Sequence, residues 1–321
     1  MEKGAFGIVG LGKMGRNLAL QALEKKYQVI GFDPYIKEEM KPAGLRFADN
    51  LNGLISQLPA PRIIFIYIPA GKAVDDLLEQ LVHLLSKGDI IIDGGNSYWG
   101  DSIRRNEKLK SAGLYFIDCG TSGGVDGARN GACFMAGGED AAMQRVAPIL
   151  KDLAVPGGYV HTGSPGSGHF VKLVHNGIEF GMLQAIGEGM DMLSHYREQL
   201  DFPKILHCWN NGSVIRSWLI ELMYKMYNEQ EGFSNVPPYI EDTGEVNWLV
   251  NDALHMEVPI PVIAQSVMQL FTSRDKTQTW ARAIAMMRHG FGGHPFGEDE
   301  GIKHERKFGR VGDYPVEEEK K

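Results

Sequence analysis

The chain has 321 residues, enough for two domains of ordinary size. Its 40 acidic residues against 33 basic ones give a net charge of −7, which argues against nucleic acid as the main partner, because a phosphate-binding surface usually carries a basic excess. The apolar runs, such as residues 63–68, are too short to span a bilayer, and no signal sequence precedes them. Three widely spaced cysteines suit buried, reduced thiols. We therefore expect a cytoplasmic protein that binds neither nucleic acid nor membrane.

The first half of the chain alternates short β-branched runs with amphipathic stretches of helical period. Runs rich in Ile and Val with little alternation are typical of strands in a sheet that is covered on both faces. The alternation of strand and helix predicts a parallel, doubly wound α/β sheet of the Rossmann type. The expected strands are 6–10, 28–33, 62–69, 89–93, 115–118, 132–136 and 159–161, and the expected helices are 14–25, 73–86, 101–112 and 140–150.

Strand signals stop at a turn-rich stretch, residues 162–168, in which Ser167 is a candidate N-cap for the helix that follows. We expect an NAD-binding domain over residues 1–165 and an all-helical domain for substrate binding and dimerisation over residues 166–289. A tail rich in Gly, Pro and charge, residues 290–321, has no core of its own, so it must lie on this subunit or a neighbour, or stay disordered. The expected helices are 169–196, 203–208, 214–227, 246–254, 261–272 and 278–287.

A glycine motif at residues 10–15 follows the first expected strand and opens a helix, as in dinucleotide-binding loops. Its glycines let backbone N–H groups approach a pyrophosphate at the positive helix N-terminus. The next strand ends in Asp33, about 20 positions later, where a carboxylate bonds the adenosine ribose and repels a 2′-phosphate. NAD is therefore favoured over NADP, although Asp33 before Pro34 could be only a turn residue. The expected cofactor contacts are Gly10, Leu11, Gly12, Met14, Gly15, Asp33, Ile68, Pro69 and Asn96.

Two further glycine-containing stretches follow expected strands, at the edge where open α/β sheets bind ligands. Residues 93–97 read Asp-Gly-Gly-Asn-Ser, and residues 121–125 read Thr-Ser-Gly-Gly-Val. In the second stretch, backbone N–H groups and the Ser122 hydroxyl could reach a substrate carboxylate. The alternative is that the glycines of both stretches serve only turns.

The first long helix carries four polar residues on one stripe, within roughly a quarter-turn. At positions i, i+3, i+4 and i+7 stand Lys172, His175, Asn176 and Glu179. A solvated face is the alternative, but it would rarely gather these residues without a partner charge at i+4. Oxidation of a secondary alcohol needs a base, and a lysine with a lowered pKa can serve. A β-hydroxy acid oxidised in this way loses carbon dioxide, and an acid must then protonate the enol carbon, so Lys172 and Glu179 are candidates for these roles.

Together these motifs resemble 6-phosphogluconate dehydrogenase, and Asp33 and the chain length resemble its short, NAD-using branch. The similarity runs from residue 6 to about residue 296. It implies oxidative decarboxylation of a 6-phosphogluconate-like aldonate to a ketopentose derivative, carbon dioxide and NADH, without a metal, with Lys172 as base and Glu179 as acid. Arg288 and His294 match a pair that in the family reaches into the neighbouring subunit's site, which implies a homodimer with exchanged tails. The implied substrate contacts are Asn96, Ser122, Gly123, Gly124, His175, Asn176, Arg288 and His294.

Positions that resemble the family's phosphate-binding residues depart from its pattern. The expected tyrosine is Phe180, the expected cation and threonine of a Thr-Gly-x-x-Lys/Arg-Trp-Thr segment are Asn247 and Leu249, and an arginine near residues 269–270 is absent. Desolvating a phosphate monoester with Arg288 alone would be costly. A substrate with a sulfonate, such as 6-deoxy-6-sulfogluconate, or with an unmodified terminus would fit. Alternatively, the missing cations are replaced by Lys225, Arg274, Lys276 or Lys303.

Two other functions remain as alternatives. A β-hydroxyacid dehydrogenase of the 3-hydroxyisobutyrate type shares the two-domain plan and the lysine but needs no acid for decarboxylation, so release of carbon dioxide discriminates between them. A non-catalytic NAD-binding sensor could keep the fold, but it would have no need of Lys172 and Glu179.

Overall fold

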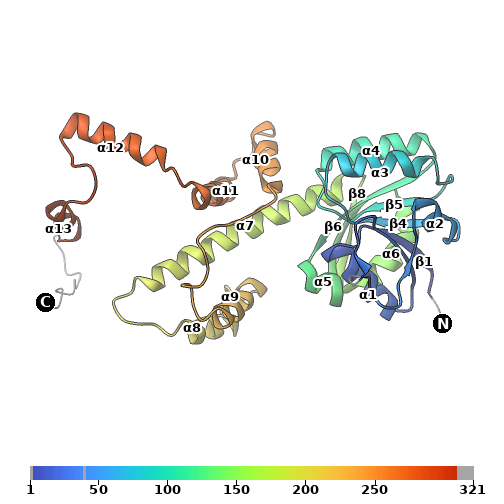
Figure 1. Ribbon diagram of the computed structural model, residues 1–321, viewed down its shortest axis with the longest axis horizontal. Coiled ribbons are helices and arrows are strands. Elements are labelled where there is room, and N and C mark those ends of the chain that lie inside the picture. Colours follow the sequence, from blue (N-terminus) through green and yellow to red (C-terminus); the bar gives the residue numbers. More distant parts are fainter. Residues whose placement is uncertain (1–2, 39–40, 309–321) are drawn as a thin grey trace. The chain divides into compact units, whose positions relative to one another are not determined.

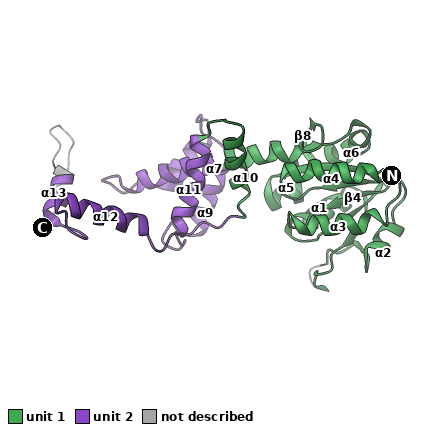
Figure 2. Cartoon of the chain, turned by 90° about the horizontal axis from the view of Figure 1, so that it is seen from above, with its two compact units in different colours: residues 1–179, 243–260 green, residues 180–242, 261–321 purple. Residues whose placement is uncertain are grey.

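The computed structural model describes residues 3–38 and 41–308 (Figure 1). The chain forms two compact units, one of residues 1–179 and 243–260 and the other of residues 180–242 and 261–321 (Figure 2). These units divide the chain differently from the predicted domains, because the helix that starts at Ser167 begins within the first unit. The domain limits at residues 165 and 289 therefore stay predictions.

The described part of the first unit contains an eight-stranded sheet with the order β3-β2-β1-β4-β5-β6-β7-β8. This order confirms the predicted doubly wound fold. The expectation of a wholly parallel sheet is wrong at one place, because β6 and β7 pair antiparallel. The chain between them, residues 123–131, is shorter than the dozen or more residues that a parallel crossover needs. The strands are β1 Ala5–Val9, β2 Gln28–Phe32, β3 Arg46–Phe47, β4 Ile63–Ile66, β5 Ile90–Asp93, β6 Tyr115–Ser122, β7 Ala132–Gly137 and β8 Ala154–Gly163.

Helices cover both faces of this sheet and enclose two apolar cores (Figure 1). Successive residues of a strand point to opposite faces, so Ile64 joins one core and Phe65 the other. This is why the central strands read as unbroken apolar runs. The short elements α2, α5 and β3 were not predicted, because they hold too few residues to show a period. The helices are α1 Lys13–Glu24, α2 Leu51–Ser56, α3 Lys72–Val82, α4 Trp99–Ser111, α5 Gly124–Asn130 and α6 Asp140–Leu153.

The rest of the described chain is helical, as predicted. The expected helix at 214–227 starts four residues later, because the Ser217 side chain accepts a hydrogen bond from the N–H of Ile220 and caps α9 there. No helix was predicted in the tail, but it contains one that Asp299 caps through the N–H of Ile302. The helices are α7 Ser167–Ser194, α8 Phe202–Asn210, α9 Trp218–Glu229, α10 Glu245–His255, α11 Pro261–Arg274, α12 Thr279–Gly292 and α13 Glu300–Phe308.

The start of α7 is capped by a strand residue. The prediction that Ser167 caps this helix is therefore wrong. The Asp118 carboxylate accepts hydrogen bonds from the backbone N–H groups of Gly166, at 2.7 Å, and His169, at 2.8 Å. The Ser167 hydroxyl instead pairs with the Thr162 hydroxyl at 2.7 Å. Burial raises the pKa of Asp118, and His169 opposes that rise. A carboxylate from β6 therefore fixes where α7 begins.

Backbone also approaches backbone at this point. A Cβ atom added to Gly168 would overlap the carbonyl oxygen of Asp118 and lie 2.6 Å from the nitrogen of Gly137. A Cβ atom on Gly120 would overlap the Cβ of Lys172. Glycine at these positions is what allows the first turns of α7 to lie directly on β6 and β7.

Two expectations from composition have different outcomes. Cys119 is buried, but Cys133 and Cys208 are exposed, so the expectation of buried cysteines is wrong for these two. Cys133 lies on β7, next to the edge strand β8, and Cys208 lies on α8. Among the described helices, none is long and apolar enough to cross a membrane.

We predict that Gly168→Ala strongly destabilises the protein, whereas Gly187→Ala, in the same helix, does not. The new methyl group at position 168 would meet only backbone atoms, which cannot move aside, so the free energy of unfolding should fall by about 2 kcal/mol or more. No atom lies within 4 Å of a Cβ at position 187. Alanine favours a helix more than glycine does, so this substitution should raise the free energy of unfolding by up to about 1 kcal/mol. Urea unfolding measures both values, and equal effects would contradict the close packing.

Candidate active site

The glycine loop lies at the point where the strand order reverses, between β1 and β4, and this is where sheets of this kind bind nucleotides. Gly10 has a φ of 91°, and a Cβ on Gly10 or Gly15 would overlap backbone atoms. Gly12 differs, because no atom lies within 4 Å of a Cβ placed there and Gly12 is the N-cap of α1. The loop thus leaves open space directly at a helix N-terminus, which suits a pyrophosphate.

Asp33 reaches this loop from the end of β2. One carboxylate oxygen accepts a hydrogen bond from the N–H of Leu11 at 2.8 Å, and the other accepts one from the N–H of Tyr35 at 2.9 Å. The residue therefore serves its own turn and also holds the glycine loop. Of the other expected cofactor contacts, Ile68 lies against Gly10, Pro69 is exposed and Met14 is half-buried.

The loop after β5 is organised by Asp93. This buried carboxylate accepts hydrogen bonds from the N–H of Gly95 at 3.1 Å and the hydroxyl of Ser97 at 2.8 Å. Arg105, also buried, lies 3.5 Å from the same carboxylate. Asn96 is left exposed at the tip of the loop. Arg105 could not be recognised from the sequence, because Asp93 lies on β5 and Arg105 on α4, and only the fold brings them together.

The second glycine loop meets α7. Gly123 and Gly124 have φ values of 107° and 60°, so both use the left-handed region that glycine favours. The Ser122 hydroxyl lies 3.1 Å from Nε2 of His175. The strand-end loop and the polar stripe of the helix are therefore parts of one cluster.

Within the stripe, His175 lies close to both candidate catalytic groups. Its Nδ1 atom is 3.4 Å from Nζ of Lys172, 3.2 Å from the side-chain oxygen of Asn176 and 3.9 Å from a carboxylate oxygen of Glu179. Asn176 is buried, and the other three are partly covered. The helical spacing thus places an amine and a carboxylate near the same ring nitrogen of one imidazole.

Burial lowers the pKa of two basic members of this cluster, Lys172 and His175. It lowers the pKa of Lys172, against the opposing influence of Glu179 and Glu245. It also lowers the pKa of His175, and the neighbouring lysine adds to that effect. A lysine whose pKa is lowered in this way can act as a base nearer neutral pH than an ordinary lysine can. Glu245, the first residue of α10, is a neighbour that sequence reasoning missed.

Helix α10 brings the altered Thr-Gly segment into the same unit. Asn247 is exposed, whereas Leu249 is buried in the packing of the helix. Trp248 packs edge-on against the ring of Tyr98, with ring centroids 5.7 Å apart. A shallow pocket beside these rings is lined by Tyr98, Asp101, Trp248 and Asn251. Polar and aromatic groups, not cations, therefore line it.

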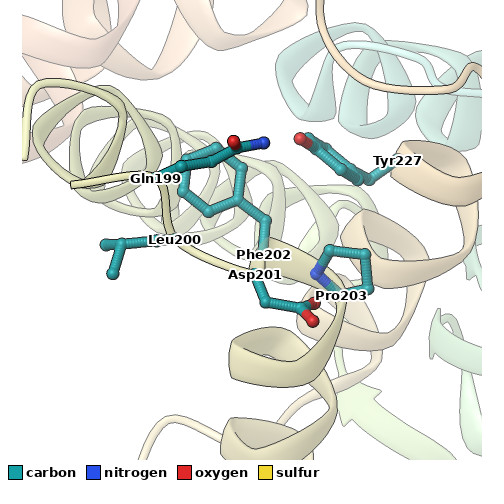
Figure 3. A pocket seen from close by; sticks show the side chains of 6 residues that line it. All are labelled: Gln199, Leu200, Asp201, Phe202, Pro203 and Tyr227. Carbon is teal, nitrogen blue, oxygen red and sulfur yellow. The ribbon is translucent and has the colours of Figure 1, made fainter.

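The remaining predicted residues belong to the second unit. Arg288 is exposed on α12, and His294 follows that helix, with its ring against Phe291. Arg274 donates to carboxylate oxygens of Asp242 at 2.8 Å and Glu241 at 3.5 Å. Figure 3 shows another pocket of this unit, formed by the turn into α8 and by Tyr227 of α9. Its lining residues are Gln199, Leu200, Asp201, Phe202, Pro203 and Tyr227.

A metal site was not expected. In the part of the chain that the structure describes, no group of three or more His, Cys, Asp or Glu side chains is placed to hold a metal ion.

We predict that the amine of Lys172 titrates at lower pH than that of Lys72, whose pKa is raised by Asp76. Because burial disfavours the ammonium form, Lys172 should become reactive as the pH rises before Lys72 does. Competitive labelling with acetic anhydride at a series of pH values, read by peptide mass spectrometry, measures both pKa values. A Lys172 pKa at or above that of Lys72 would contradict the burial of this amine.

Comparison with known proteins agrees with the resemblance drawn from the motifs. The family model described as the NAD binding domain of 6-phosphogluconate dehydrogenase matches residues 5–163, and the model of the C-terminal domain of 6-phosphogluconate dehydrogenase matches residues 168–302. The chain is 42% identical over 291 residues to YqeC of Bacillus subtilis, covering 90% of this chain and 98% of that protein. It is 38% identical over 293 residues to the NAD(+)-dependent, decarboxylating 6-phosphogluconate dehydrogenase of Haloferax volcanii, covering 90% and 97%.

Among solved structures, 6-phosphogluconate dehydrogenase of Plasmodium falciparum, which was studied with NADP+ and with 6-phosphogluconate, superposes with a TM-score of 0.77. The sequence identity is 27%, and the match covers 92% of this chain but 66% of that longer protein. The sheet unit is thus an NAD(P)-binding domain, and the chain is a dehydrogenase. The chain belongs to the 6-phosphogluconate dehydrogenase family.

Proposed function

We propose that the protein catalyses the NAD-dependent oxidative decarboxylation of a 6-phosphogluconate-like aldonate, which yields a ketopentose derivative, carbon dioxide and NADH. The observation that carries this proposal is the cluster on α7, where His175 lies 3.4 Å from Lys172 and 3.9 Å from Glu179. A base and an acid on one helical face match a reaction that first removes a proton from oxygen and later adds one to carbon.

The residues divide the reaction between them. Lys172 takes the proton of the β-hydroxyl group. NAD, which the glycine loop and Asp33 would hold, would supply the acceptor for the hydride that the same carbon gives up. Carbon dioxide leaves from the resulting β-keto acid, and Lys172 returns its proton to the enolate oxygen. Glu179 then donates a proton to the carbon that lost the carboxylate, while Lys172 again takes the proton of the enol hydroxyl. The lowered pKa of Lys172 supports its part, because a neutral amine is required at the start.

Groups around this pair hold the substrate. The Ser122 hydroxyl and the backbone N–H groups of Gly123 and Gly124 bind the carboxylate, and His175 and Asn176 bind hydroxyl groups. Asn96 contacts both substrate and cofactor from the loop after β5. The hydrogen bond between Ser122 and His175, at 3.1 Å, supports a shared role for the second loop and the helix.

Arg288 and His294 complete the site of a neighbouring subunit in a homodimer. Support comes from α12, on which no residue is buried within the chain and on which Trp280 and Phe291 are 59% and 77% exposed. Large apolar side chains in such a row are typical of a helix that is covered by another subunit. Sedimentation equilibrium should give twice the chain mass of 35.5 kDa, and a monomer mass would refute the dimer.

The group at the end of the substrate opposite the carboxylate carries less charge than a phosphate does. Arg274, one of the candidate substitutes for the missing cations, already pairs with Asp242 and Glu241. Turnover of 6-phosphogluconate, 6-deoxy-6-sulfogluconate and gluconate, measured side by side as kcat/KM, tests this hypothesis. A clear preference for the phosphate would refute it and would leave the decarboxylation unaffected.

We predict that Lys172→Met lowers kcat by about 1,000-fold or more, because the base is lost, while NAD still binds. Glu179→Gln should slow carbon dioxide-linked turnover by a factor of about 100, because the acid is lost. Absorbance of NADH measures turnover, and tryptophan fluorescence measures binding of the cofactor. Full activity of Lys172→Met would contradict the assignment, and NADH formation without carbon dioxide would favour a 3-hydroxyisobutyrate-type dehydrogenase.

We predict that Asp33→Asn lowers the preference for NAD over NADP by at least about 10-fold in kcat/KM. The substitution removes the charge that repels a 2′-phosphate, and the amide oxygen can still accept from the N–H of Leu11. The measurement is kcat/KM for each cofactor at saturating substrate. An unchanged ratio of the two kcat/KM values would mean that Asp33 only stabilises the turn after β2 and does not select the cofactor.

A further inference from the structure

Both ring nitrogens of His169 have hydrogen-bond partners near the candidate active site, although this residue is not part of the polar stripe. It is 2% exposed on the first turn of α7. Its Nε2 atom lies 3.1 Å from the carbonyl oxygen of Asp93, and its Nδ1 atom lies 2.7 Å from the hydroxyl of Ser102. Its backbone N–H donates to Asp118 at 2.8 Å. One residue of α7 is therefore bonded to β5, α4 and β6.

The chemistry of these bonds fixes part of the arrangement. A carbonyl oxygen only accepts, so Nε2 must carry a proton and donate it to Asp93. In a neutral imidazole, a proton on Nε2 leaves Nδ1 as an acceptor, so the Ser102 hydroxyl donates to it. A buried imidazole whose polar atoms are all paired specifies one arrangement of its neighbours, because any other arrangement would leave a buried polar group without a partner.

That arrangement joins the two parts of the candidate site. The Asp93 carbonyl immediately precedes the loop with two glycines that carries Asn96. Lys172 follows His169 by three residues, which is about one helical turn. Glycines make the loop easy to displace, so a hydrogen bond at its first peptide restricts where Asn96 lies relative to Lys172.

We propose that His169 is a positioning residue that fixes the Asn96 loop relative to Lys172. This inference rests on the proposed function, in which Asn96 contacts substrate and cofactor and Lys172 is the base. The loop is held on its other side by Arg105 and Ser97 through the Asp93 carboxylate. Those bonds fix the position of the Asp93 carboxylate, whereas His169 fixes the position of the Asp93 carbonyl group. The bond from His169 links this loop directly to α7.

The test compares His169→Leu with His169→Gln, whose amide can still donate to the Asp93 carbonyl. Displacements of about 1 Å at a reacting centre cost on the order of 100-fold in rate. We expect His169→Leu to lower kcat by about 10- to 100-fold with a smaller change in KM, and His169→Gln to recover most of that loss. Wild-type kcat in the leucine variant, or equal losses in both variants, would overturn the proposal.

His161→Leu is the matched control. Its Nε2 also bonds backbone carbonyl oxygens, those of Gly138 at 3.1 Å and Gly163 at 2.9 Å, but these bonds involve neither the Asn96 loop nor α7. Loss of this histidine should leave kcat within about threefold of the wild-type value, although Tm falls. A kcat loss as large as that of His169→Leu would show a general effect of destabilisation and would overturn the positioning role.

A second readout separates this inference from the proposed function. The pKa of Lys172, measured by acetic anhydride labelling without substrate, should rise toward that of exposed Lys72 in His169→Leu and rise less in His169→Gln. If the wild-type protein turns over none of the aldonates, the proposed function fails, and this labelling still decides the role of His169. An unchanged Lys172 pKa in His169→Leu would then overturn it.

Discussion

The contact of α7 with β6 and β7 is the constraint on which the candidate site depends. Gly168 allows backbone to meet backbone, and Asp118 accepts from two N–H groups at the helix start. Because the start of the helix is fixed, the position of Lys172, about one turn further along α7, is fixed as well. Its side chain begins against Gly120. The same burial that makes this contact lowers the pKa of the lysine. The close packing of α7 on the sheet therefore both positions Lys172 and lowers its pKa.

The sequence predicted the parts of the fold that depend on local patterns. Apolar strands such as Ile90–Asp93 are readable because both faces of the sheet are covered, and α7 is readable because it is long and periodic. Features that depend on distant partners were not readable. The antiparallel pairing of β6 with β7 follows from a short connection. The cap of α7 comes from Asp118, which precedes the predicted cap, Ser167, by 49 residues.

The candidate site divides in the same way. The spacing of Lys172 and Glu179 predicts a common helical face because spacing alone determines it. The pairing of His175 with Ser122 joins residues from different elements and required the fold. Arg105 and His169 gave no signal in the sequence, because a buried charged or polar residue is recognised only by the partners that satisfy it. Long-range hydrogen bonds are thus the part of the site that the pattern of residues does not contain.

Membership of the 6-phosphogluconate dehydrogenase family and the arrangement on α7 lead to one central claim, that oxidation and decarboxylation occur on one substrate in one site. The most direct measurement uses an aldonate labelled with 13C at its carboxylate and follows labelled carbon dioxide and NADH in the same reaction. The account predicts that the two form in equal amounts throughout the reaction. NADH that accumulates while the label stays in a non-volatile acid would contradict it.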